Sequence, residues 1–171
     1  IEDLKNCTVG KCSIGLSAEM IERFKKEIDW KAANYSDQAT QIFRKILLEY
    51  VQDYLARGDE ALIEYRNRAN PLNLRDEQKS MLNRLFWLNE FAPEFSNYLT
   101  NFPKSQLNNV RKTLTWTKIK FGLKPVIVVT QTITYTVEKN SISQILSVSK
   151  QIYATRYFDS SLGLTALIEF P

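Results

Sequence analysis

The sequence contains no histidine. This absence excludes nucleophile pairs of the serine–histidine–aspartate and cysteine–histidine kinds, and it excludes zinc sites built on histidine. It also removes the side chain that most often serves as a general base near neutral pH. Catalysis would therefore depend on carboxylates, lysine, tyrosine or a borrowed cofactor. We predict no catalytic residues, no metal site and no cofactor.

Glycine and proline are scarce, at five residues each, and the glycines never cluster. The chain therefore has no glycine-rich phosphate loop, and its composition does not favour disorder. Long apolar runs are also missing, because none approaches the 18 residues that a membrane-spanning helix requires. The net charge of +4 is mild, and the basic residues are mixed with acidic ones. This distribution is typical of a solvated surface and not of a nucleic-acid interface.

Only two cysteines are present, Cys7 and Cys12, and they flank the segment Thr8-Val9-Gly10-Lys11. Two thiols alone cannot complete a tetrahedral metal site. In a cytosolic protein they would be reduced side chains, whereas in an exported protein they would close a small disulfide loop in which Gly10 favours the turn. We favour export, to the periplasm or the cell exterior, because the chain begins at Ile1 without a methionine, as a processed product would.

The composition is that of an ordinary globular protein, with 44% hydrophobic and 25% charged residues, and 171 residues can bury one proper core. Helix caps and apolar stripes predict helices that start after Ser17, Ser36, Asp59 and Asn73 and at Pro93. The longest should end at Gly58. Residues 104–121 fit both a helical spacing and, around Trp116, strand alternation; we predict a helix there.

A strand pattern dominates the C-terminal part of the chain. From Val126 to Val137 threonines alternate with apolar residues, and a second run follows from Ile142 to Ala154. A third run alternates from Leu164 to Phe170. We therefore predict an α+β fold in a single domain, 1–171. Its mainly helical portion, 1–121, carries five or six helices, and these pack on an antiparallel sheet of three or more strands at 125–170.

The hydrophobic pattern also predicts a register for the first hairpin. A four-residue turn between Val137 and Ile142 sets Ile133 opposite Leu146, Gln131 opposite Val148 and Val129 opposite Lys150. Ile152 and Ala154 then share the inward face with two polar residues, Gln131 and Lys150, which lie on a diagonal of the ladder.

A buried lysine is costly unless it is paired or faces a wet cavity. The simplest interpretation is that Lys150 reaches water at an edge or meets a carboxylate. The alternative is a ligand-binding site formed by Gln131, Lys150 and Arg156. Arg156 joins it only if the second strand continues past Ala154.

Several segments resemble an uncharacterised family of exported bacterial proteins. They are the N-terminal Asn6-Cys7…Cys12 segment, FGLKPV at 121–126, KQIYATRYFD at 150–159 and SLGLT at 161–165. The resemblance spans nearly the whole chain. It implies export, and it implies no activity, cofactor or site residue.

Three functions remain open from the sequence. The first is a non-catalytic binding protein that holds an apolar or anionic, lipid-like small molecule between helices and sheet. The second is a structural module of the cell envelope that recruits a protein partner through an exposed sheet edge. The third and least favoured is a histidine-independent hydrolase that uses Lys150, or Asp159 with Glu169.

Overall fold

The computed structural model describes residues 1–120, 124–139 and 142–168. Among these residues it has six α-helices, which precede the long strands, and a C-terminal antiparallel sheet of four strands. The predicted α+β class is therefore confirmed. Backbone contacts divide the chain into two compact units, Ile1–Arg75 and Asp76–Pro171. The single-domain expectation stays a prediction.

The first unit is mainly helical. Its elements in chain order are α1 (Glu2–Lys5), α2 (Ala18–Glu27), α3 (Tyr35–Arg57), the 3-10 turn η1 (Gly58–Ala61), β1 (Glu64–Tyr65) and β2 (Leu72–Asn73). The Ser17 side chain accepts a hydrogen bond from the Met20 amide, which confirms the predicted cap of α2. Helix α3 starts at Tyr35, so its N-cap is Asn34, two residues before the predicted Ser36. It ends at Gly58, where φ is +64°, a conformation that glycine adopts without strain.

The helix predicted after Asp59 is wrong. One turn of 3-10 helix is followed by the short strand β1, which pairs with β2 through Glu64 opposite Asn73 and Tyr65 opposite Leu72. A capping residue at Asp59 is not enough to make this segment helical, because its apolar residues become buried in an extended conformation. Leu62, Ile63 and Tyr65 are all buried.

The N-terminal loop is closed by Cys7 and Cys12, whose Sγ atoms lie 1.94 Å apart. The expected disulfide pairing is therefore supported. Within the loop Gly10 has φ +84°, and the Thr8 amide donates to the Lys11 carbonyl. The Gly10 amide donates to the Arg66 carbonyl at 2.7 Å, which fixes the loop to the segment that contains β1.

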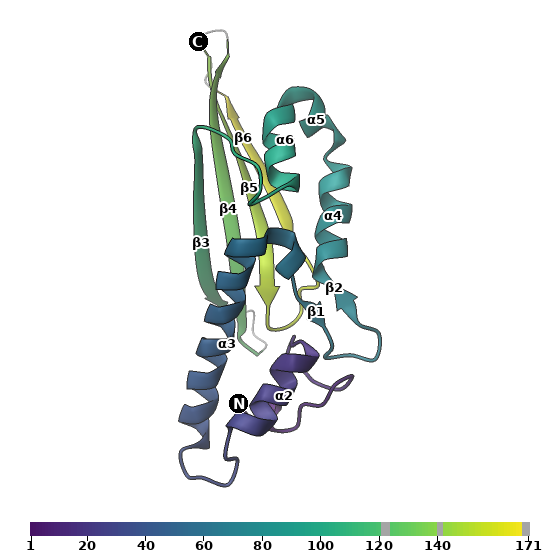
Figure 1. Ribbon diagram of the computed structural model, residues 1–171, viewed down its shortest axis with the longest axis vertical. Helices are drawn as coiled ribbons and strands as arrows, with labels where there is room; N and C mark the ends of the chain where they lie inside the picture. The colour runs from purple at the N-terminus through teal and green to yellow at the C-terminus, as the bar shows by residue number, and fades with distance from the viewer. Residues whose placement is uncertain (121–123, 140–141, 169–171) are drawn as a thin grey trace. The chain divides into compact units, whose positions relative to one another are not determined.

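The second unit holds the remaining elements. They are α4 (Leu74–Arg84), which begins at the end of the first unit, α5 (Phe86–Phe91), α6 (Pro93–Thr100), β3 (Val110–Ile119), β4 (Val126–Lys139), β5 (Ile142–Ala154) and β6 (Leu162–Ile168). The Asn73 side chain accepts from the Arg75 amide, and Pro93 occupies the first turn of α6, as predicted. The four long strands lie side by side in the order β3-β4-β5-β6, so β3 and β6 form the two edges (Figure 1).

The helix predicted over 104–121 is wrong, because Val110–Ile119 forms strand β3. Every residue of β3 is paired with β4, from Val110 opposite Tyr135 to Ile119 opposite Val126. The alternating threonines around Trp116 favour a strand, and the long β4 supplies a full set of backbone partners. The helical spacing of Leu107, Val110 and Leu114 was coincidental.

The predicted hairpin register is also wrong, because each residue of the first strand from Thr130 onward pairs with a residue two positions further along the second strand than predicted. Ile133 lies opposite Val148 and not Leu146, and Gln131 lies opposite Lys150. The last pair before the turn is Lys139 opposite Ile142, so the ladder extends further than the expected turn allowed. The face of each residue is preserved up to Lys150, because a shift of two residues changes the partner and not the side.

A β-bulge at Ile152 changes the faces beyond that point. Thr130 pairs with Gln151 whereas Val129 pairs with Tyr153, so Ile152 is the extra residue. Ala154 consequently lies opposite Val128 on the other face, which corrects its predicted inward position. There Val126, Val128 and Ala154 form a small buried cluster, on which Ile119 and Phe158 pack.

Candidate functional site

The two predicted polar residues of the sheet lie directly opposite each other. Gln131 and Lys150 are Cα partners in neighbouring strands, and they are 1% and 5% exposed. Directly opposed residues in an antiparallel pair have Cβ atoms about 5 Å apart, closer than the predicted diagonal. The structure therefore brings the carboxamide and the amine together on the face of the sheet that also carries Val129, Ile133 and Tyr135, here named the Tyr135 face.

Arg156 was predicted to join this pair only if the second strand continued past Ala154. Strand β5 ends at Ala154, so the condition for an inward Arg156 is not met. The bulge at Ile152 also reverses the alternation, so a continued strand would have placed Arg156 on the opposite face from Lys150. After Ala154 the chain turns, and Tyr157 has φ +67°.

The Tyr135 face is covered at one point by α6. The Phe95 and Tyr135 rings stack with centroids 5.3 Å apart, and the Tyr135 hydroxyl donates to Glu94 at 3.0 Å. Burial is the largest cause that raises the pKa of Tyr135 above its ordinary value of 10.0, and the Glu94 hydrogen bond adds to it. This aromatic contact positions α6 on the sheet.

A buried glutamine that the sequence did not single out links α4 to the end of the sheet. Gln78 is fully buried, and its Nε2 donates to the Gln151 carbonyl, the Ser160 hydroxyl and the Ser161 carbonyl. In the sequence Gln78 is one polar residue within a helical pattern. A polar residue in such a pattern is usually exposed to solvent, so the sequence does not indicate that Gln78 is buried. Its role here is structural.

A cleft of about 580 Å³ lies within the first unit. Its walls come from Val9, from α2, from α3 and from residues 61–66. None of Gln131, Lys150 and Arg156 lines it, so the sequence interpretation missed this position. The signal in the sequence is the set of charged residues spaced four apart on α3, Glu49, Asp53 and Arg57, and the mixing of charges over the whole chain does not distinguish them from a solvated surface.

The floor of the cleft is apolar and its rim is charged. The floor consists of Met20, Ile46, Tyr50, Ala61 and Ile63, all of which are buried. Burial also raises the pKa of Tyr50, so its phenol stays neutral at neutral pH, and the phenol oxygen accepts a hydrogen bond from the Ile63 amide at 3.3 Å. The rim carries three arginines, Arg23, Arg57 and Arg66, and four carboxylates, Glu19, Glu49, Asp53 and Glu64.

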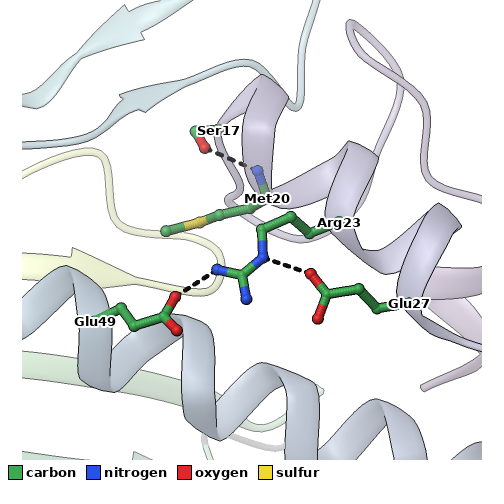
Figure 2. A network of polar contacts seen from close by, with 5 residues as sticks. All are labelled: Ser17, Met20, Arg23, Glu27 and Glu49. Atoms are coloured by element: carbon green, nitrogen blue, oxygen red, sulfur yellow. Dashed lines mark hydrogen bonds and ion pairs between the residues drawn. The ribbon is translucent and has the colours of Figure 1, made fainter.

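Arg23 connects the two helices of the rim. Figure 2 shows its guanidinium between Glu27 of the same helix and Glu49 of α3, with Nε to Glu27 Oε1 at 2.7 Å and Nη1 to Glu49 Oε2 at 2.5 Å. These hydrogen bonds, the one to Glu27 first, raise the pKa of Arg23. Two bonds occupy two of the three guanidinium nitrogens, and Nη2 remains directed at neither carboxylate (Figure 2).

Two further ion pairs complete the rim. Arg57 contacts Asp53 through two nitrogens, and its hydrogen bonds lower the pKa of that carboxyl. Arg66 donates to Glu64 at 3.0 Å. These side chains are about half exposed, so solvent screens each pair and it contributes little to stability. The ion pairs have a local consequence, because each one holds a cation beside an anion at the rim of the apolar floor.

Neither metal chemistry nor the carboxylate pair receives support. Within 1–120, 124–139 and 142–168 no group of three or more Cys, Asp or Glu side chains is arranged to hold a metal ion. Asp159 is exposed, and Glu169 lies outside the described residues.

Across the described residues we find no helix with the length and apolarity to cross a membrane. The disulfide is compatible with an exported protein. Comparison with protein-family models, with curated proteins and with solved structures finds no match to this chain.

Proposed function

We propose that this chain is a non-catalytic binding protein and that the cleft of the first unit holds a small amphiphile with a zwitterionic head group. The observation that carries the proposal is the composition of the cleft, which combines a buried apolar floor with a rim of alternating charges. Its volume of about 580 Å³ falls in the range of small-molecule pockets. An apolar body would cover the floor, and the head group would meet the rim.

The charge balance favours a zwitterion over a simple anion. Three arginines face four carboxylates, a difference of one negative charge. A purely anionic head would meet the arginines together with their attached carboxylates, and like charges raise the free energy of binding. A zwitterionic head places its anion on Arg57 or Arg66 and its cation on Glu19, which extends into solvent from the first turn of α2.

Isothermal titration calorimetry with n-dodecylphosphocholine below its micelle concentration tests the proposal. Arg57→Gln removes one cation from the rim, and the loss of a charge-assisted hydrogen bond of about 1.5 kcal/mol weakens binding about tenfold. Arg44→Gln is the matched control, because Arg44 is exposed on the same helix and does not line the cleft. Equal affinities of the two variants, or no binding heat with the native protein, would contradict the proposal.

Two further ligands separate the head-group chemistries. Dodecanoate carries only the anion and dodecyltrimethylammonium only the cation, so each should bind more weakly than the zwitterion. Glu19→Gln should weaken binding of dodecylphosphocholine and leave dodecanoate unchanged. If dodecanoate binds best, the ligand is an anionic amphiphile.

The Gln131–Lys150 pair is a second candidate position for an anionic group, supported by the direct opposition of the two side chains. Lys150→Met removes the cation and retains much of its apolar stem. If the pair binds ligand, this variant loses dodecanoate binding whereas Arg57→Gln retains it. A melting temperature measured for each variant identifies any loss that arises from unfolding.

We also propose that the protein works in an oxidising compartment. The proposal is supported by the Cys7–Cys12 pair. Protein isolated from its native source and alkylated without reductant should gain no mass, because a disulfide has no free thiol. Addition of two alkyl groups would place the chain in a reducing compartment.

A further inference from the structure

The two edges of the four-stranded sheet differ in charge. Strand β3 carries Arg111, Lys112 and Lys118 along its ten residues, whereas the seven residues of β6, LGLTALI, carry no charge. Charged side chains, lysine above all, are a common protection against pairing between sheet edges. The β3 edge has this protection and the β6 edge lacks it.

The backbone of β6 presents hydrogen-bonding groups at its outer edge. The Gln151 amide donates to the Ser161 carbonyl at 3.0 Å, and the register continues with Ser149 opposite Gly163. Because hydrogen-bonded positions alternate along an antiparallel ladder, Gly163, Thr165 and Leu167 direct their amides and carbonyls to β5. The alternate residues direct theirs to the outer edge; they are Leu162, Leu164, Ala166 and Ile168.

The C-terminal part of this edge is exposed. Leu167 and Ile168 are 59% and 53% exposed, and Thr165 and Ala166 are also exposed. Among the described residues β6 pairs in the sheet only with β5. An apolar, uncharged edge with a row of outward amides and carbonyls is the geometry that accepts another strand.

We propose that β6 pairs antiparallel with β6 of a second copy of this chain, around a two-fold axis at Thr165. The sequence of β6 is complementary to itself in this register, because Leu164 comes opposite Ala166 and Leu162 opposite Ile168. Each apolar residue on the Tyr135 face then meets an apolar residue of the other copy. The two sheets join into one continuous sheet, and an isologous pairing of this kind closes after two copies.

The face of the sheet opposite the Tyr135 face supports the same register for the pairing of the two β6 strands. Thr165 lies opposite Ser147, which lies opposite Thr134, so these hydroxyl residues form one row across three strands. In the proposed pair Thr165 comes directly opposite Thr165 of the second copy, and the hydroxyl row continues without interruption. Threonine pairs are favourable cross-strand neighbours.

The contact is small, and its strength follows from its size. A stable interface buries about 1,200–2,000 Å² in total, and two seven-residue strands provide less. The dimer should therefore dissociate in the micromolar range. Sedimentation equilibrium from about 1 to about 500 µM spans that range. The mass should rise from 19.9 kDa towards twice that value as the concentration increases.

Substitution at the two-fold axis gives the specific test. Thr165→Lys places two like charges directly opposite each other only in the proposed dimer, so this variant should remain monomeric at every concentration. Thr165→Glu should behave in the same way, and an equimolar mixture of the two should associate again. Thr115→Lys is the matched control, because Thr115 is an exposed threonine on the β3 edge and its change should leave association unaltered.

A cysteine at the axis tests the register independently. Residues opposed at a position without hydrogen bonds have Cα atoms about 4.5 Å apart, which is within disulfide range. Thr165→Cys should therefore form a covalent dimer under mild oxidation, and Thr115→Cys should not. The proposal is overturned if the native chain stays monomeric over the whole range, if its dimer survives Thr165→Lys, or if the charge-swapped mixture does not associate.

Discussion

The two faces of the sheet in the second unit are built from the same strands and differ in what holds them. On the Tyr135 face the rings of Phe95 and Tyr135 stack, and Val129, Ile133 and Val148 are at most 2% exposed. The other face, named here the hydroxyl face, consists of half-buried Thr130, Thr132, Thr134, Ser147 and Ser149. Its side chains meet as hydroxyl pairs, Thr132 with Ser149 at 3.2 Å and Thr134 with Ser147 at 3.1 Å.

This difference separates two contributions to the stability of one sheet. Burial of apolar side chains supplies the large favourable term in folding, whereas a partly solvated hydroxyl pair exchanges bonds with water at little net gain. The hydroxyl face also ends where the bulge reverses the alternation, since Val126, Val128 and Ala154 are buried beyond it. Stability should therefore be concentrated on the Tyr135 face and beyond the bulge.

Removal of the aromatic contact should have the largest effect. Phe95 is fully buried, and Phe95→Ala should lower the free energy of unfolding by about 3–5 kcal/mol, because it deletes the buried ring and leaves a cavity. Urea unfolding followed by circular dichroism measures this change. Amide hydrogen exchange along β4 locates it in the second unit.

Phe91→Ala is the matched control for this change. Phe91 lies on α5 and is 73% exposed, so the same chemical deletion removes little buried surface. Its effect should stay within about 0.5 kcal/mol. Similar losses in both variants would show that the Tyr135 face does not dominate the stability of the sheet.

The alternation in β4 is the part of the fold that the sequence determines most directly. A period of two assigns Ile133 and Thr132 to opposite faces whatever the partner strand, and this assignment is correct. The partner was predicted less well, because shifting Ile133 from Leu146 to Val148 changes one aliphatic neighbour for another. Such neighbours differ too little to fix a register without the turn.

The bulge and strand β3 were missed for a different physical reason. Ile152 is apolar and fits a continued alternation, so nothing in the sequence indicates that it is the extra residue. Strand β3 forms because β4 is its pairing partner. The local sequence pattern of β3 does not predict which other segment will pair with it. The cleft was missed similarly, since Arg23 and Glu49 meet only after α2 and α3 pack together.

Ionisation of Tyr135 tests how strongly the Tyr135 face excludes water from its polar groups. Burial and the Glu94 hydrogen bond raise its pKa, so the folded protein keeps the phenol neutral where the unfolded chain has ionised it. Its contribution to stability is therefore complete below pH 10 and is lost as the pH rises through the folded pKa. Tyr135→Phe should cost about 1 kcal/mol at neutral pH and reduce the loss of stability above pH 10.

Unfolding free energies measured between about pH 8 and pH 11 test this expectation. Glu94→Gln should make the loss of stability above pH 10 smaller, because it removes the carboxylate that accepts a hydrogen bond from the phenol. Glu90→Gln is the control, because Glu90 is exposed on α5. An unchanged alkaline slope in Tyr135→Phe would show that this phenol ionises as freely in the folded chain as in the unfolded one.

The smallest effect is expected on the hydroxyl face, where a double-mutant cycle isolates one pair. Thr132→Val keeps the branched shape and removes the hydroxyl, and Ser149→Ala removes its partner. The coupling between the two changes should be about 0.2–1 kcal/mol, as for other cross-strand pairs. Thr132→Val combined with Ser147→Ala is the control cycle, because Ser147 is bonded to Thr134, and its coupling should be near zero. A coupling for Thr132 and Ser149 as large as the loss in Phe95→Ala would mean that water does not reach these hydroxyls, and the two faces would then be equal in strength.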